Sequence, residues 1–282
     1  MEKIDIVMSV EKAVKLLSKL DVDVFDVYAA YSRSLNIGIL GKGIKEANSR
    51  TDLGIGVRAY KSKGLGVAFS QSLKPRDVRT TVDRAVSFTR AAQPDPYFKG
   101  IPGPSKAPEV RGLRDRKVMD LSLEEAGELA KRMLDGAANV CLGAMYVGDF
   151  SATYVRGCLM TSTGVSFSTE KTFVSAFIGP TYKKDDDIGS SSEFEESISL
   201  AEVDFDKIGR KAAEKALEQF GSRKVESGML PIILSPESTA SVIFGLLEAI
   251  SGESAVKGRT FASGCLGKQV APEMLEIDDD GT

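Results

Sequence analysis

The sequence predicts an α+β fold, with two helix-plus-antiparallel-sheet units in its N-terminal part and then the opening strand and helix of a separate C-terminal domain. Amphipathic helical patterns alternate with groups of strand patterns of period two. A proline-rich stretch separates the two groups, and a charged linker precedes a last apolar stretch. We therefore expect an N-terminal unit at residues 1–95, a connector at 96–118, a central unit at 119–222, and the beginning of the C-terminal domain at 226–282.

The first unit opens with a helix, because Val10, Val14 and Leu17 recur with helical spacing while lysines occupy the opposite face. Strand patterns follow, and they predict an antiparallel meander at residues 23–28, 35–40, 53–60 and 64–70. A helix from Pro75 to about Ala92 ends the unit, with the proline at a position that helices favour.

Paired glycines mark both strands of the last predicted hairpin, at Gly54 and Gly56 and at Gly64 and Gly66. A phosphate-binding loop is one interpretation. However, no Gly-Lys-Ser/Thr follows, and neither pair has the third glycine and helix start of a dinucleotide site. We therefore expect a sheet bend or the close approach of another backbone.

The second unit follows a connector that contains Pro94, Pro96, Pro102, Pro104 and Pro108. Its basic cluster, Arg111, Arg114, Arg116 and Lys117, is interpreted as a solvated face, because Asp115 interrupts it and no aromatic residues alternate with it. The predicted elements are a helix at 121–138, strands at 142–150, 152–161 and 165–178, an acidic mobile loop at 182–196, and a helix at 206–220. The order helix, strands, helix thus occurs twice, which makes a duplication a hypothesis about topology alone.

The C-terminal stretch predicts a short buried strand at Leu230–Leu234 and a helix at Thr239–Ile250. This helix is apolar almost all round. We therefore expect it to be enclosed by other elements.

Composition excludes several classes of function. None of the 282 residues is histidine, which removes the commonest general base and nearly every common zinc site. The net charge of -3 gives no field that would attract nucleic acid, and no segment resembles a signal peptide or a membrane-spanning helix, so we expect a cytoplasmic protein with no nucleic-acid or membrane partner. Cys141, Cys158 and Cys265 lack paired spacing and are expected to be free thiols in a reducing compartment.

Two kinds of histidine-free chemistry stay open as alternatives. A Ser/Lys dyad needs both side chains on one surface; Ser168 and Lys171 fall in a strand, where residues three apart point to opposite faces, so Ser254 and Lys257 are the remaining pair. Glu248 and Glu253, together with the terminal aspartates, are candidate ligands for a hard cation such as magnesium.

Three segments together resemble the TldD/PmbA family, also called modulators of DNA gyrase. These are the hairpin Gly54–Phe69, the apolar helix Ala240–Gly252, and the downstream Gly267-Lys268-Gln269-Val270, which occur in the family's order. The resemblance implies a two-subunit cytoplasmic zinc peptidase. In it the TldD-type subunit carries His-Glu-x-x-x-His on the equivalent helix, and the PmbA/TldE-type subunit lacks a complete metal site.

Aligned with that motif, this chain has Ile243 and Glu248 at the histidine positions and Phe244 at the position of the general base. An isoleucine cannot ligate zinc and a phenylalanine cannot accept a proton, so the resemblance implies no catalytic and no metal-binding residue in this chain. Zinc is then expected in a partner subunit. The helix would serve in packing, with an apolar stripe of Val242, Leu246, Ala249 and Ile250 at the subunit interface.

The resemblance thus predicts a PmbA/TldE-like, non-catalytic subunit, paired with a TldD-type catalytic subunit in a heterodimer or with itself in a homodimer, acting on unfolded polypeptides. The alternatives are a regulator that binds DNA gyrase or another protein, and a self-contained histidine-free hydrolase. The resemblance also implies that the C-terminal domain is β-rich and continues past the equivalent of Thr282, so we interpret residues 226–282 as the start of a β-rich C-terminal domain that is truncated here. We expect exposed hydrophobic surface and doubtful solution stability along residues 230–266.

Overall fold

The computed structural model describes residues 5–104 and 110–278, and these divide into two compact units, Met1–Ser222 and Arg223–Thr282. Helices and one antiparallel sheet build the first unit, so the predicted α+β class is confirmed. Among the described helices, none has the length and apolar character needed to cross a bilayer.

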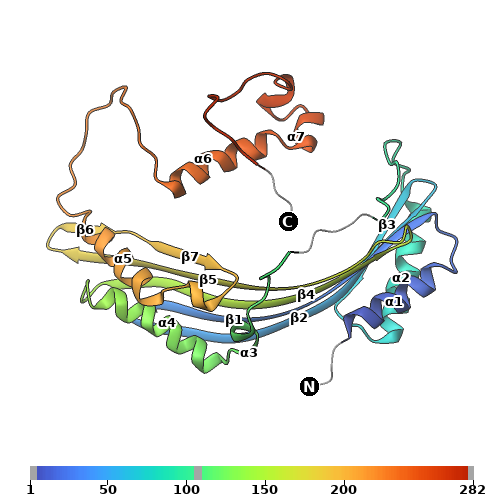
Figure 1. The fold of residues 1–282 in the computed structure, drawn as a ribbon, viewed down its shortest axis with the longest axis horizontal. Coiled ribbons are helices and arrows are strands. Elements are labelled where there is room, and N and C mark those ends of the chain that lie inside the picture. Colours follow the sequence, from blue (N-terminus) through green and yellow to red (C-terminus); the bar gives the residue numbers. More distant parts are fainter. Residues whose placement is uncertain (1–4, 105–109, 279–282) are drawn as a thin grey trace. The chain divides into compact units, whose positions relative to one another are not determined.

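The sheet of the first unit has seven strands (Figure 1). Six of them are neighbours in the order β3-β2-β1-β4-β5-β6, and the seventh, β7, also pairs with β5. All of the pairings are antiparallel. The strands are β1 (Val24–Gly41), β2 (Gly43–Lys61), β3 (Gly64–Ser70), β4 (Met145–Thr161), β5 (Ser166–Lys184), β6 (Asp187–Ser190) and β7 (Glu193–Ser197).

The four long strands, β1, β2, β4 and β5, exceed their predicted lengths. Polar side chains at residues 32–34 and along most of the first half of β2 hide the period-two pattern, but both stretches belong to the continuous pairing of β1 with β2. The expected break near Ser151 does not exist, since β4 runs unbroken between β1 and β5. Pairing on both sides satisfies the backbone there, so strand structure does not require an apolar side chain at every second position.

The acidic segment 182–196 was predicted to be a loop, and this prediction is wrong. Its residues continue β5, turn at Asp185 with a positive φ of 53°, and form β6 and most of β7. Carboxylates on the two short strands are tolerated because these strands lie beside solvent, and Glu193 pairs with Lys215 at 2.5 Å.

The helices of the first unit are α1 (Ile6–Leu17), α2 (Pro75–Ala91), α3 (Arg116–Asp120), α4 (Leu123–Ala138) and α5 (Phe205–Leu217), with a short 3₁₀ turn, η1 (Leu200–Glu202). Ser122 starts α4 with a reciprocal capping box to Glu125. Asp5 and Asp204 accept amide hydrogen bonds at the starts of α1 and α5. Figure 1 places α1 and α2 at one end of the curved sheet and α4 and α5 at the other.

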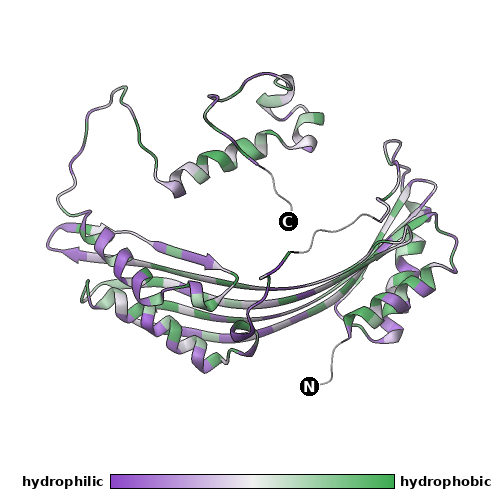
Figure 2. Cartoon of the chain, viewed as in Figure 1, coloured by the Kyte–Doolittle hydropathy of each residue, from purple (hydrophilic) through white to green (hydrophobic). Residues whose placement is uncertain are grey.

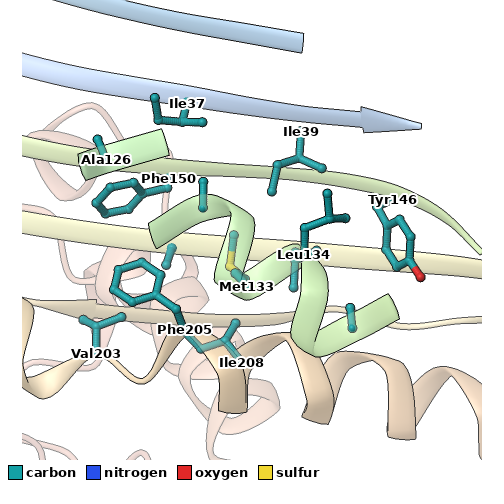
Figure 3. Packing of buried hydrophobic residues seen from close by; sticks show 14 of the residues in the cluster. Ile37, Ile39, Ala126, Met133, Leu134, Tyr146, Phe150, Val203, Phe205 and Ile208 are labelled. Atoms are coloured by element: carbon teal, nitrogen blue, oxygen red, sulfur yellow. The ribbon is translucent and has the colours of Figure 1, made fainter. Parts of the chain in front are cut away.

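Two separate hydrophobic cores lie on the same face of this sheet. Phe25, Val27 and Ala29 of β1 pack under α1 and α2, whereas Leu35, Ile37 and Ile39 of the same strand pack under α4 and α5. All six are odd-numbered residues of one strand, and side chains of alternate residues share a face. In the second core, Phe150 and Phe205 meet edge to face with ring centroids 5.1 Å apart (Figure 3). The two helix-and-strand units are therefore joined through the β1–β4 pair into one sheet.

The strand order is symmetric about the β1–β4 pair, and glycines repeat this symmetry. A Cβ on Gly66 of β3 would lie 1.9 Å from the carbonyl oxygen of Ala85 in α2, and one on Gly189 of β6 would lie 2.0 Å from the carbonyl oxygen of Ala216 in α5. In each half the third strand thus lets the following helix approach to backbone contact. This confirms the predicted close approach at Gly66 and supports the hypothesis of a duplicated topology.

The second unit contains α6 (Pro236–Ala249), α7 (Gly252–Val256) and a 3₁₀ turn, η2 (Phe261–Gly264). The buried strand expected at Leu230–Leu234 is not formed: these residues have no regular secondary structure and are exposed. A single strand needs a neighbour to satisfy its backbone, and the described part of this unit provides none.

Candidate functional site

Helix α6, on which the sequence analysis predicts the positions equivalent to a metal motif, begins at Pro236. The hydroxyl of Ser235 accepts a hydrogen bond from the amide of Ser238 at 3.2 Å. The prediction that this helix is enclosed is wrong. Phe244 is 69% exposed, and Val242 and Ile250 are exposed as well, although Ala249 is buried. Figure 2 shows the apolar colour along the helix. Since α7 and η2 are short, they offer too little surface to cover it.

Ile243 and Phe244 are adjacent on α6, and Glu248 lies in its last turn, although the side chain of Glu248 is outside the described part of the structure. Zinc sites in proteins use imidazole, thiolate and carboxylate ligands. Neither Ile243 nor Phe244 supplies any of these, so the residues at this position do not fit zinc. In the described part of the chain, no group of three or more His, Cys, Asp and Glu side chains is arranged to hold a metal ion.

Ser254 and Lys257 lie at α7, where Lys257 is the residue that follows the helix. The Lys257 ammonium forms an ion pair with Glu253, one turn away. Within the described residues no hydrogen bond joins the Ser254 hydroxyl to this amine. Ser254 and Lys257 are thus neighbours in the sequence, but in the structure the lysine ammonium is paired with the carboxylate of Glu253.

The cysteines are dispersed. Cys141 belongs to the core under α4 and Cys158 to the core under α1, and both are buried, while Cys265 is partly exposed in the second unit. Burial raises the pKa of the Cys141 thiol. A raised pKa keeps the thiol protonated, which is the unreactive form.

A polar band crosses the helix-covered face between the two cores. On β4 and β5 it consists of Tyr154, Arg156 and Glu170, placed side by side by the strand register. The Glu170 carboxylate forms ion pairs with Arg156 at 3.0 Å and with Arg114 of the connector at 2.5 Å. Burial raises the pKa of the Tyr154 hydroxyl, and the negative charge of Glu170 raises it further.

A slot of about 670 Å³ adjoins this band. Its walls are the start of α1, the connector residues 110–114, and residues 167–170 of β5, and it is lined by three arginines, Arg111, Arg114 and Arg156, against one glutamate, Glu170. The volume lies in the range of ligand-binding pockets. We call this cavity the β5 slot.

Sequence reasoning missed the β5 slot, because Arg111 and Arg114 were interpreted as part of a solvated face. A signal was present in β4, where Tyr154 and Arg156 occupy inward-facing positions between the buried Ala152 and Cys158. Polar residues in the middle of an apolar alternation indicate a place where the core is interrupted.

Asp115 fixes the connector beside the β5 slot. Its carboxylate accepts hydrogen bonds from the hydroxyl of Ser199 at 2.7 Å and the amide of Leu200 at 3.0 Å. Its own amide donates to the hydroxyl of Thr172 at 2.8 Å, and the amide of Thr172 donates to the carbonyl of Leu113 at 2.9 Å. Burial by itself would raise the pKa of Asp115, but the hydrogen bonds from Ser199, Lys117 and Leu200 outweigh it and lower the pKa.

Comparison with known proteins agrees with this architecture. Three domain models of one family match the chain: PmbA/TldA metallopeptidase domain 1 at residues 25–87, the central domain at 117–220, and the C-terminal domain at 227–282. The chain is 22% identical to the metalloprotease PmbA homolog of Buchnera aphidicola subsp. Acyrthosiphon pisum, over 99% of this chain and 63% of that protein. It is 24% identical to metalloprotease PmbA of Escherichia coli O157:H7, over 84% of this chain and 53% of that protein.

The crystal structure of TldE from Thermococcus kodakarensis has the same fold, with a TM-score of 0.77 and 20% identity over 91% of this chain and 58% of that one. The chain spans less than two thirds of the length of each of these relatives. The three domain models match in their chain order and together account for most of the sequence. The chain belongs to the PmbA/TldD family.

Proposed function

We propose that this chain acts as the PmbA/TldE-type, non-catalytic subunit of a TldD/TldE-type zinc peptidase that processes or degrades unfolded polypeptides in the cytoplasm. One observation carries the proposal: no histidine occurs in the 282 residues. Ile243 and Phe244 of α6, which we align with the motif, are apolar and support it. A zinc peptidase needs ligands for the ion and a base for the attacking water. In this proposal both come from the partner subunit.

The exposed surface of α6 supports a role in assembly. Val242 and Phe244 of α6, and Ile250 directly after it, expose large apolar side chains. Exposed apolar side chains gathered in one short segment are typical of sites that another protein element covers. A TldD-type subunit would form the heterodimer, and a second copy of this chain would form the homodimer.

Co-expression of this chain with a TldD-type subunit tests the proposal. We expect the two proteins to purify together and to cleave an unfolded peptide, and we expect this chain alone to be inactive. The matched control is the same complex with the motif histidines of the TldD-type subunit replaced by alanine, which should assemble but not cleave. Two proteins that fail to associate, or cleavage by this chain alone, would contradict the proposal.

A further inference from the structure

The first half of β2 is an edge of the sheet. β3 pairs with β2 only at residues 55–61, at the end of the sheet that carries α1 and α2 (Figure 1). Among the described residues, no backbone group bonds to the outer side of residues 46–53. This stretch spans about 26 Å at the usual strand rise of ~3.3 Å per residue. A free strand edge offers a row of amide and carbonyl groups that another strand can pair with.

The described residues that flank the gaps in the first unit lie on the opposite side of the sheet. A Cβ on Gly164, in the turn between β4 and β5, would lie 3.9 Å from Pro104. Ile6 and Val110 line the β5 slot. Since β1 and β4 lie between β2 and β5 in the sheet, these residues are not neighbours of the β2 edge.

The turn from β2 to β3 shows which residues of the edge direct their backbone outward. Ser62 and Lys63 form this two-residue turn, with positive φ values of 49° and 67°. The strand residues that flank such a turn form a hydrogen-bonded pair, so Lys61 directs its amide and carbonyl toward β3. Backbone direction alternates along a strand, and the pairing of β1 with β2 has no register shift between residues 46 and 60. The odd-numbered residues from Lys61 back to Ala47 therefore all direct theirs to that side.

The charges of this edge lie on one face of the sheet. The face away from the helices carries the even-numbered residues, because their partners on β1 are even-numbered and the two cores take the odd-numbered ones. These residues are Glu46, Asn48, Arg50 and Asp52. On the other face, Ala47, Ser49 and Thr51 are small and exposed. Mixed charge ordinarily protects an edge, because most partner strands would meet a like charge.

A second copy of the same edge meets opposite charges in one register. Two copies related by a two-fold axis pair antiparallel. An axis at Asn48 places Glu46 of each copy opposite Arg50 of the other, and such cross-strand pairs stabilise a sheet. On the other face Ala47 lies opposite Ser49, so no bulky side chains meet there. Each of these Ala47–Ser49 pairs would exchange two backbone hydrogen bonds, since both residues direct theirs outward.

The neighbouring registers are less favourable. An axis at Ser49 would place Glu46 opposite Asp52, and an axis at Arg50 would place two arginines together. An axis at Thr51 pairs Arg50 with Asp52, but it sets Glu46 against the part of β2 that β3 already occupies. The charges that discourage other partners therefore select one register of a second copy.

The two charged side chains can each take a further partner. Arg50 forms an ion pair with Asp52 of its own strand at 2.6 Å, yet its side chain is 70% exposed. A guanidinium has five N–H donors, more than one carboxylate can accept. The Glu46 carboxylate accepts one hydrogen bond, from Asn48 at 2.8 Å, and Glu46 is exposed.

We propose that two copies of this chain associate through the first half of β2, with the two-fold axis at Asn48, and so join their sheets into one. Backbone hydrogen bonds hold the two strands together, and the Glu46–Arg50 pairs set the register. The contact is small, so the dimer is weak and forms at high protein concentration. It involves the first unit alone and needs neither zinc nor a TldD-type subunit, so it holds or fails independently of the proposed function.

Sedimentation equilibrium of the purified chain at low salt, from micromolar to millimolar concentration, measures the association. We expect a monomer–dimer equilibrium that weakens as salt is added. Glu46→Lys and Arg50→Glu each place like charges opposite one another at both ends of the contact. Each is expected to weaken the dimer about tenfold or more.

Mixing these two variants tests the register itself. In the mixed dimer, the new lysine of one chain faces the new glutamate of the other, and a native Glu46–Arg50 pair forms at the second position. We therefore expect the mixture to associate about as tightly as the unmodified chain. The double variant Glu46→Lys/Arg50→Glu should likewise associate with itself, because both pairs are reversed together.

Two further variants serve as controls. Glu11→Lys, at an exposed position of α1, makes the same change in charge elsewhere and should have no effect. Ser49→Pro removes an outward amide that the pairing with β1 does not use, so the strand can keep its fold while the dimer is lost. Circular dichroism establishes whether each variant is folded.

A chain that stays monomeric at every concentration would overturn the proposal. Equal association of all variants would do the same, since the contact would then lie on another surface such as α6. A mixture of the two single variants that fails to associate contradicts the register. If one single variant does not fold, the other single variant and the double variant decide the result.

Discussion

Gly66 and Gly189 hold equivalent positions in the two halves of the first unit, each beneath a helix backbone. Gly66→Ala and Gly189→Ala are therefore each expected to lower the free energy of unfolding by about 1–3 kcal/mol, because the helix must move away from the strand. Gly43→Ala is the control, since an added Cβ there meets no atom within 4 Å. Urea unfolding measures the effect, and equal stability of all three variants would contradict the close packing.

Asp115 links the connector to β5 and to the turn η1, and its lowered pKa makes this link depend on pH. A carboxyl group with a lower pKa in the folded state stabilises the protein above its unfolded pKa of ~3.9, and this stabilisation is lost as pH falls toward the folded value. We expect Asp115→Asn to be less stable than the unmodified chain at pH 7, with the difference narrowing below pH ~4. Urea unfolding between these pH values measures this difference.

Asp135→Asn, an exposed position of α4, controls for the loss of a carboxylate as such. Its stability should follow that of the unmodified chain across the pH range. A constant difference between Asp115→Asn and the unmodified chain at every pH would show that the hydrogen bonds do not depend on the charge of Asp115.

The core beneath α4 and α5 is built around the contact of Phe150 with Phe205, both of which are buried. Phe205→Ala removes most of a large buried side chain, and we expect a loss of about 3–5 kcal/mol in the free energy of unfolding. Phe69→Ala is the matched control, since Phe69 is 78% exposed. Similar losses in the two variants, measured by urea unfolding, would contradict the assignment of Phe205 to the core.

The helices of the first unit could be predicted from the sequence because their apolar stripes, prolines and capping residues are local signals, as at Pro75 and at Ser122 with Glu125. The full lengths of β1, β2 and β4 could not be predicted. Their central residues are polar, and β1 and β4 are held by pairing with each other across more than 100 residues of sequence, as in the register of Tyr31 with Arg156. Such long-range pairing leaves no local pattern.

The β5 slot was hidden for the same reason. Arg114 and Glu170 are 56 residues apart in the sequence and meet only because the connector returns to β5. By contrast, the absence of histidine and the apolar residues at Ile243 and Phe244 needed no structure. The sequence therefore mainly excluded kinds of chemistry, namely zinc binding and catalysis by histidine. The structure adds a surface, the β5 slot.

At the scale of the whole molecule, the two units differ in how they bury their apolar residues, and α6 shows the difference best. The first unit buries its apolar residues in two cores, whereas the second unit leaves large side chains such as Met229, Ile233 and Phe244 exposed. The prediction of exposed hydrophobic surface along residues 230–266 thus agrees with the structure. Surface of this kind favours association, which agrees with a subunit of a larger assembly.

The zinc content of this chain, purified alone and within a complex with a TldD-type subunit, tests the central claim most directly. Inductively coupled plasma mass spectrometry of both preparations gives the metal per chain, and a peptide cleavage assay on the same samples gives the activity. We predict that the chain alone holds no stoichiometric zinc and is inactive, and that zinc and cleavage appear together only with the partner. One tightly held zinc ion per chain, with cleavage by the isolated chain, would contradict the account.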